Sequence, residues 1–392
     1  MRSVNSTLHL QSWQVIAGGI CSLLLTVGMA RFAYTPMIPH MQAEAGLGIL
    51  DSGWLATANY LGYMTGAALA AWIDDPRWRL RLYTVGLLLG VISTLAMGNT
   101  TSVTLWALWR YLGGLSGAAG MLLGTGLILG WLMRHGHRPE LGLHFTGLGG
   151  GIALSALAAQ TFVWLDWPWN WQWWGYGTLA FVCWIPAMLL KPDVAPVAAV
   201  AVRPMQKGRW MLPMVLMYFC AGVGFAFSAT YMVTLVESLP GLAGQGPLAW
   251  LVVGLASIPA VYAWDRLARA MGTIVALGLA LAMQMLSVVL PALMSDLWVA
   301  LLSAALFGGT FTGIVSMTLA FVGQHSPSNP GKAMARLTLS YGVAQVVTPT
   351  LTAFVLSSTG NYQAPLWMTA LFLSMGIALL VWVHQRSRSD TP

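Results

Sequence analysis

The chain has 392 residues, of which 57% are hydrophobic and 7% are charged, and its mean hydropathy is +0.71. Soluble domains carry about a quarter charged residues, so this composition excludes a soluble globular protein. The apolar runs are about 20 residues long and show no strict alternation, which predicts membrane-spanning helices and not a membrane β-barrel.

The formal net charge is +7, and the positions of the basic residues explain it. They fall in alternate connecting segments, whereas the charged residues of the other connecting segments are acids, with no lysine or arginine. The positive-inside rule therefore predicts that both termini are cytoplasmic, and no nucleic-acid partner is expected. The basic segments contain Arg77, Arg79, Arg81, Arg134, Arg138, Lys191, Arg203, Lys207, Arg209, Arg266, Arg269, Lys332, Arg336, Arg386 and Arg388, and the acidic ones contain Glu44, Asp51, Asp166, Glu237 and Asp296.

Twelve membrane-spanning helices are predicted along the chain, and the fold class is all-α. In chain order they cover 14–40, 52–73, 80–98, 102–133, 139–165, 171–190, 210–237, 247–265, 271–293, 296–323, 332–357 and 364–385. The proline-rich and basic segment 191–209 is the only long break, and we interpret it as a cytoplasmic linker. It divides the chain into an N-terminal six-helix bundle, 1–190, and a C-terminal six-helix bundle, 210–392.

The two halves share a weak internal repeat. A nearly constant shift across three pairs of spans favours a duplicated six-helix unit, which is typical of secondary transporters. The shift is 196 between Val27-Gly28-Met29-Ala30 and Val223-Gly224-Phe225-Ala226, 195 between Gly113-Gly114 and Gly308-Gly309, and 195 between Gly147 and Gly342.

Arg31 is the first candidate for a functional residue because it lies deep inside the first span. A charge near the middle of a bilayer costs about 2.5 kcal/mol or more, so such residues face a bundle interior or a water-filled cavity. Arg110 lies at similar depth in span four. Two guanidinium groups favour an anionic ligand, since each offers a planar fork of donors. The alternative for both is a structural role in which they bind backbone carbonyls or an internal acid.

Several motifs resemble the major facilitator superfamily. The segments DDPRWRLR at 74–81 and WDRLAR at 264–269 are similar to its cytoplasmic loop motif, and RYLGGLSGAAG at 110–120 is similar to its motif in span four. The segments 31–41, 54–67, 144–153, 307–313 and 337–349 resemble the YbfB/YjiJ-type branch. The resemblance implies two six-helix bundles in which spans one, four, seven and ten line a central cavity.

This mapping assigns roles to individual positions. Glu140 and His144, four residues apart at the start of span five, form a candidate proton-coupling pair, with a structural pair that closes the cytoplasmic end as the alternative. The repeat places Phe227 where span one has Arg31, so the second half should supply an aromatic wall. The candidate gating residues are Asp74, Asp75, Arg77, Asp265 and Arg266. The candidate substrate-binding residues are Arg31, Tyr34, Asn59, Tyr60, Tyr63, Arg110, Phe227, Tyr231, Thr310, Tyr341 and Gln345, with Thr312 and Ser316 nearby.

The sequence therefore predicts a secondary transporter in the inner membrane of a bacterium. It would carry a small organic solute, anionic or amphipathic, by alternating access, with membrane lipid around it and protons as the coupling ion, and we expect a monomer. Efflux of hydrophobic drugs or metabolites by antiport and a membrane sensor without flux are the alternatives. Cys21, Cys183 and Cys220 lie inside apolar runs with no metal-ligand spacing, so neither a metal nor a cofactor is expected, and no catalytic pair indicates an enzyme.

Tryptophans gather around one outer turn, and we interpret them mainly as an interfacial belt. They are Trp164, Trp167, Trp169, Trp171, Trp173 and Trp174.

Overall fold

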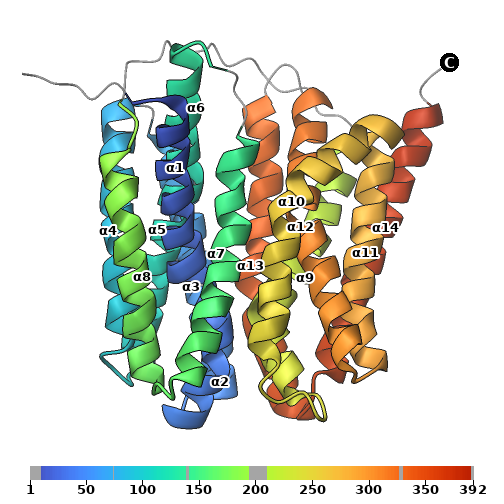
Figure 1. Cartoon of the computed structure of the whole chain (residues 1–392). Coiled ribbons are helices and arrows are strands. Elements are labelled where there is room, and N and C mark those ends of the chain that lie inside the picture. Colours follow the sequence, from blue (N-terminus) through green and yellow to red (C-terminus); the bar gives the residue numbers. More distant parts are fainter. Residues whose placement is uncertain (1–9, 74, 138–140, 194–209, 326–329, 390–392) are drawn as a thin grey trace, which may run out of the picture.

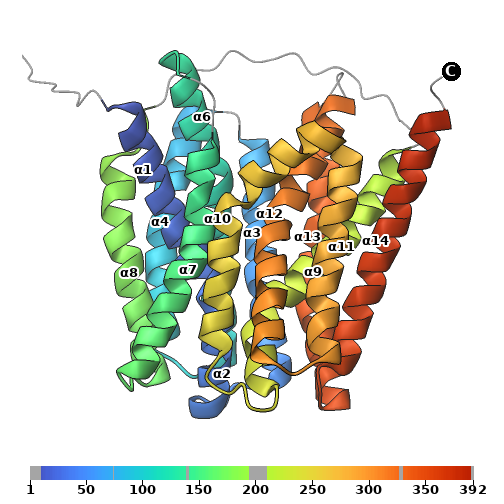
Figure 2. The same cartoon turned by 45° about the vertical axis from the view of Figure 1, so that its right-hand side comes forward.

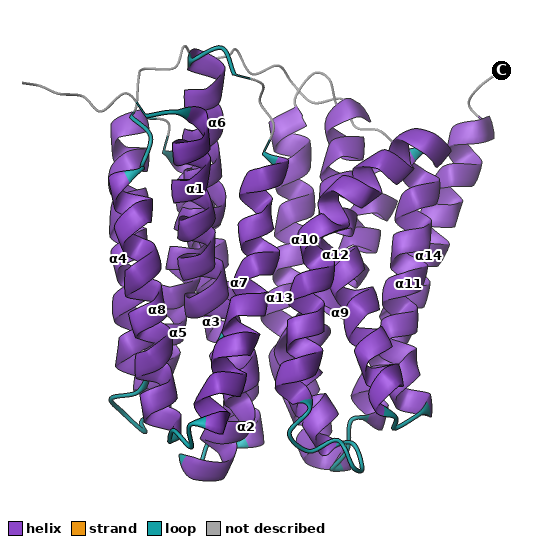
Figure 3. Ribbon diagram, viewed as in Figure 1, coloured by secondary structure: helices purple, strands orange, loops and turns teal. Residues whose placement is uncertain are grey.

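The computed structural model describes residues 10–73, 75–137, 141–193, 210–325 and 330–389. All regular structure in these ranges is helical, and the helices run side by side as one bundle (Figures 1 and 3). Residues 194–209, most of the predicted linker, lie outside the described residues.

The first half contains six continuous helical stretches. Their elements are α1 (Ser12–Leu23), η1 (Leu24–Phe32), α2 (Tyr34–Glu44), α3 (Ile49–Trp72), α4 (Pro76–Met97), α5 (Val103–Ala118), η2 (Ala119–Gly124), α6 (Thr125–Arg134), α7 (Gly142–Trp164) and α8 (Trp169–Leu189). The labels η1 and η2 mark π-helical segments, in which the turn is widened. They join α1 to α2 and α5 to α6, so each of those groups is a single span.

The second half contains six uninterrupted helices. They are α9 (Met211–Ser238), α10 (Gly246–Met271), α11 (Thr273–Leu293), α12 (Leu297–His325), α13 (Pro330–Thr359) and α14 (Gln363–Ser389). The described residues thus form twelve helical stretches, which confirms the predicted number. Span eight shows the largest difference in position, because α10 continues to Met271 and not only to residue 265.

Ten of the described helical stretches are long and apolar enough to cross a membrane. Two further stretches, α3 and α8, are not among them. Their apolar content is diluted by residues that interact with neighbouring helices or with the membrane interface, such as Asn59 in α3 and the tryptophans of α8. These two helices pack within the same bundle as the other ten.

The halves are arranged side by side (Figure 2). In the first half α3 packs on α5 and α4 packs on α8, whereas in the second α9 packs on α13 and α11 packs on α12 and α14. The halves meet where α7 contacts α10, where α3 contacts α13 and where α2 contacts α9. The start of α1 and the end of α14 lie on one side of the bundle, which we call the terminal side, and α2 lies on the opposite side (Figure 1).

Glycines allow the closest contacts between these helices, as expected from their clustering. A Cβ atom on Gly28 would lie 2.7 Å from the Cα of Gly151, and one on Gly113 would lie 2.9 Å from the carbonyl oxygen of Ala30. The first contact seats η1 against α7, and the second seats α5 against η1. Both therefore fix the segment that carries Arg31.

Candidate functional site

Arg31 lies in the π-helical segment η1, which interrupts the first span. Pro36 follows in the next turn and has no N–H to donate, so a carbonyl in the preceding turn lacks its usual main-chain partner. π-Helical turns are rare and occur frequently at functional sites. The π-helical turn thus widens the helix at Arg31, where backbone oxygens accept hydrogen bonds from outside the span.

Arg110 on α5 supplies the donors of these hydrogen bonds. Its Nη1 donates to the carbonyl oxygens of Ala30 at 3.1 Å and Arg31 at 3.3 Å, and its Nη2 donates to the Arg31 oxygen at 3.2 Å. Its guanidinium lies 4.3 Å from the ring centre of Tyr34, and Asn59 Nδ2 donates to the Arg110 carbonyl at 2.8 Å. Arg110, Tyr34 and Asn59 therefore form a brace that holds span one to α3 and α5.

The Arg31 side chain points to the junction of the halves and is 8% exposed. Its Nη2 donates to Oε1 of Gln345, on α13, at 3.0 Å. The guanidinium also lies over the rings of Tyr63 at 4.5 Å and Tyr60 at 4.9 Å, where cation–π attraction stabilises the charge. Nε is buried without a hydrogen-bond partner. The assigned partners of the whole Arg31 guanidinium among the described side chains are one amide and aromatic rings, and none is a carboxylate.

An aromatic cluster on the second half faces this arginine. Phe225 on α9 lies 6.5 Å, between ring centres, from Tyr60 and 5.7 Å from Tyr341. Phe311 on α12 lies 5.4 Å from Phe225, and Tyr341 stacks on Tyr218 at 4.5 Å. An aromatic wall in the second half is therefore present beside the tyrosines that surround Arg31.

Phe225 and Tyr218 were missed by the sequence interpretation, which placed Phe227 in the wall. Phe227 instead contacts Tyr231, at 6.1 Å between ring centres. The physical reason is the helical period, because two residues along a helix turn the side chain by about 200° and move it to another face. The Phe307 and Phe311 pair within FGGTFTG, spaced four apart, was the signal in the sequence that indicated an aromatic face.

Two more predicted residues lie outside the Arg31 environment. Tyr231 donates its hydroxyl to the Pro349 carbonyl at 2.7 Å, and Thr310 donates to the carbonyl of Leu306 at 2.7 Å. Each is satisfied within the second half. The structure thus brings together Arg31, Tyr60, Tyr63, Tyr341 and Gln345, with Arg110, Tyr34 and Asn59 directly behind them.

The candidate proton-coupling pair is described only in part, because Glu140 lies outside the described residues. His144 is fully buried on α7. Its Nε2 lies 3.0 Å from Oγ1 of Thr125, and its Nδ1 has no hydrogen-bond partner.

The gating motifs are helical, which corrects their placement in loops. Arg77 lies in the first turn of α4, where Asp75 accepts a hydrogen bond from the Arg77 backbone N–H at 2.8 Å, and Asp74 lies outside the described residues. Arg266 and Asp265 lie in the last turns of α10. Asp265 forms its ion pair with Arg269 and not with the predicted Arg266, since residues four apart share a helix face.

Two threonines form hydrogen bonds between the halves, toward the side of the bundle on which α2 lies. Thr35 on α2 donates to the Ala229 carbonyl on α9 at 2.6 Å. Thr57 on α3 donates to the Val346 carbonyl on α13 at 2.8 Å and lies 2.8 Å from the hydroxyl of Thr350. With the Arg31–Gln345 bond, these contacts hold the halves together on the side of α2.

Two halves of six helical stretches each, packed side by side, have the architecture of the major facilitator fold. Two structures of the nucleoside transporter NupG have this fold. The point mutant matches with a TM-score of 0.75 and the other with 0.72, each at 12% identity. Each match covers 95% of this chain, and the matches cover 99% and 98% of the NupG chains. Identity this low shows the fold alone.

The sequence comparison gives the family. The model of the family described as "Uncharacterised MFS-type transporter YbfB" matches residues 23–381, and the chain belongs to this family. The uncharacterized MFS-type transporter YceJ of Bacillus subtilis (strain 168) is 30% identical over 97 residues, which is 25% of each chain. This chain thus matches a quarter of that relative's length. The protein is therefore a multi-pass membrane protein of this transporter family.

Proposed function

We propose that the protein is a secondary active transporter of a small organic anion with an apolar part, which binds Arg31 at the junction of the two halves. The observation that carries the proposal is the incomplete satisfaction of a buried guanidinium. Arg31 has one side-chain hydrogen bond, from Nη2 to Gln345, and a buried Nε with no partner. A charge so placed is costly unless it is paired, and a carboxylate or phosphate is the partner that its planar fork binds best.

The difference between the two arginines supports this assignment. Arg110 also has a buried Nε without a partner, but its Nη atoms donate to two backbone carbonyls, which supports a structural role. Arg31 bonds to an uncharged amide, which a carboxylate or phosphate can displace, because such a ligand adds an opposite charge and can accept two parallel hydrogen bonds from the guanidinium. Tyr60, Phe225 and Tyr341 provide apolar surface for the remainder of the solute.

Alternating access is the transport mechanism that we propose. With cytoplasmic termini, the bonds made by Thr35, Thr57 and Arg31 close the halves on the outer side. The composition and the bacterial relative favour the inner membrane of a bacterium as the location of the protein. The working unit that we propose is a monomer. Coupling to protons through Glu140 and His144 is part of the proposal. It predicts that His144→Gln abolishes the response of transport to a proton gradient.

The decisive experiment measures binding and flux with the full chain. Thermal stability of the purified protein is recorded against aryl carboxylates, short-chain carboxylates, organic phosphates, organic cations and a neutral nucleoside, followed by flux of the active compounds in proteoliposomes. We expect stabilisation by anions with an aromatic or alkyl part. Arg31→Ala should abolish this stabilisation. Arg31→Lys should lower the affinity for these anions about tenfold or more, because the bidentate geometry is lost. Arg134→Ala is the matched control at a distance from the site.

Each of the other results points to another function. Equal responses to anions in wild type and Arg31→Ala would remove the anion proposal. Stabilisation by hydrophobic cations with outward flux would favour drug efflux by antiport. Specific anion binding without flux across the whole panel would favour the membrane sensor.

A further inference from the structure

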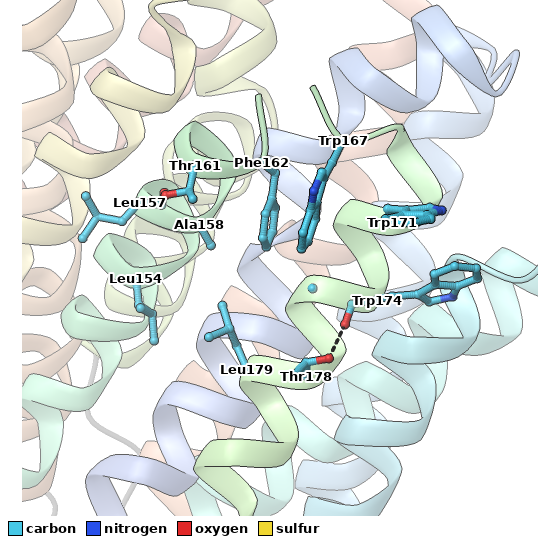
Figure 4. A pocket seen from close by; sticks show the side chains of 11 residues that line it. Leu154, Leu157, Ala158, Thr161, Phe162, Trp167, Trp171, Trp174, Thr178 and Leu179 are labelled. Carbon is cyan, nitrogen blue, oxygen red and sulfur yellow. Dashed lines mark hydrogen bonds between the residues drawn. The ribbon is translucent and has the colours of Figure 1, made fainter. Parts of the chain in front are cut away.

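A second, two-part site lies on the first half, at the opposite side of the bundle. Its apolar part is an open groove of about 530 Å³ between α7 and α8 (Figure 4). Its polar part is a pocket of about 340 Å³ between α2 and the start of α8. Trp167 lines both parts, so they adjoin one another.

The groove has the surface of a site for an alkyl chain. Leucines line it on one side, and aromatic rings line it on the other, as Figure 4 shows. Phe162 and Trp167 stack at 5.0 Å with their planes 8° apart. Trp171 is 52% exposed and Trp174 is 37% exposed, which is typical of tryptophans at a membrane interface. We therefore interpret the groove as open to lipid near the membrane interface.

The polar pocket contains a buried acceptor that lacks a donor. Gln172 is 1% exposed and lines the pocket, and its Oε1 has no hydrogen-bond partner. The orientation of its amide is fixed, because Nε2 donates to the Trp167 carbonyl at 2.9 Å and a carbonyl can only accept. The unpartnered atom is thus an acceptor held in place in a buried position.

Two carboxylates stand in the same pocket. Glu44 accepts from the backbone N–H of Trp169 at 2.9 Å through Oε2, and its Oε1 lies 3.7 Å from Nδ1 of His40. Asp166 also lines the pocket and is exposed. The start of α8 would attract an anion, but Glu44 already occupies its first N–H. The pocket therefore favours a cation that donates several hydrogen bonds.

We propose that this site binds a long-chain ammonium amphiphile whose head carries no phosphate. The ammonium group donates to Gln172 Oε1 and pairs with Asp166 and Glu44, while the alkyl chain lies in the groove beyond Trp167. A phosphate beside the ammonium would face the two carboxylates, and the pocket lining supplies no lysine or arginine to hold it. The site is separate from Arg31, and its occupant differs in charge from the proposed solute.

The test uses the purified full chain in neutral detergent, with dodecylammonium as the probe. Thermal shift and native mass spectrometry measure binding. Dodecanol lacks the charge and ethylammonium lacks the chain, so both should bind at least about tenfold more weakly than dodecylammonium. Equal binding of dodecanol and dodecylammonium overturns the proposal.

Variants assign the binding to this site. Asp166→Asn keeps a side chain that tolerates the positive φ of 51° at this position, and it should weaken dodecylammonium binding about tenfold or more. Asp296→Asn is the matched control, since it removes an exposed carboxylate from the second half. Thr178→Phe should also weaken binding, by filling the groove. If Asp166→Asn and Asp296→Asn bind equally well, the site assignment is wrong.

Two further measurements test the head group and the independence of this site from Arg31. Retention of phosphatidylethanolamine with no response to dodecylammonium overturns the assignment of a phosphate-free head. Binding of anions at the Arg31 site should remain at its wild-type level in Asp166→Asn, so failure of one proposal is distinguishable from failure of the other.

Discussion

The contact between Gly28 on η1 and Gly151 on α7 predicts a sharp difference between two adjacent glycine substitutions. A Cβ on Gly151 would lie 2.8 Å from the Cα of Gly28, so the helices must separate by about 0.7 Å to reach the 3.5 Å of ordinary carbon contacts. Overpacking costs about 1–3 kcal/mol, and about 2–3 kcal/mol is expected here because the atoms met are backbone and cannot move aside; helix propensity returns about 1 kcal/mol. We expect Gly151→Ala to destabilise the protein by about 1–2 kcal/mol.

Gly150 is the matched control in the next position. A Cβ there meets only Leu24 Cδ2, at 3.5 Å, which is an ordinary contact. Gly150→Ala should therefore stabilise the protein by up to about 1 kcal/mol through helix propensity. Thermal unfolding of the purified proteins, compared with the wild type under one set of conditions, measures the order of the three stabilities.

The same pair tests whether the helix contact fixes the candidate site. Because η1 carries Arg31, its displacement by Gly151→Ala should also weaken anion binding, whereas Gly150→Ala should leave it unchanged. Equal stabilities of the two variants, or a Gly151→Ala protein as stable as the wild type, would refute the close packing of η1 on α7.

Three further predictions follow from the contacts of single residues. Arg110→Lys should destabilise the protein by about 1–3 kcal/mol in thermal unfolding, because one ammonium cannot replace a guanidinium that donates to two carbonyls; unchanged stability would contradict the brace. Asp265→Asn should change stability by no more than about 0.5 kcal/mol, since its pair with Arg269 is exposed; a larger loss would reveal an additional partner. Gly308→Ala should destabilise the protein by about 1–3 kcal/mol because its Cβ would meet the backbone of α10, while Gly309→Ala faces open space and should not; equal effects would exclude that contact.

The sequence predicted the number and order of the helices because lipid imposes a length and an apolar composition on each span. It did not predict the π-helical segments η1 and η2, since a widened turn changes neither length nor hydropathy. The donor to the widened turn, Arg110, lies 79 positions along the chain from Arg31, whose carbonyl it binds. Such a partner becomes evident only when the helices are packed.

The candidate site was predictable in its charge and less so in its aromatic residues. Arg31 was conspicuous because a charge inside an apolar run needs a reason. The repeat indicated the correct helix for the aromatic wall, but the face of that helix depends on its rotation, and the wall is formed by Phe225 and not by Phe227. Gln345 was among the candidate substrate-binding residues, but its hydrogen bond to Arg31 across the halves came only from the structure.

The hydrogen bond between Arg31 and Gln345 links solute recognition to the relation between the halves. A ligand shifts a conformational equilibrium only by its differential interaction with the two states. An anion that takes Arg31 from Gln345 removes one of the bonds that join α13 to the first half, and the bonds of Thr57 to α13 remain. The brace formed by Arg110 stays intact during this exchange, because all its assigned hydrogen bonds lie within the first half. In the proposed mechanism, Arg110 thus preserves the shape of the first half, while Arg31 places the solute at the boundary between the halves.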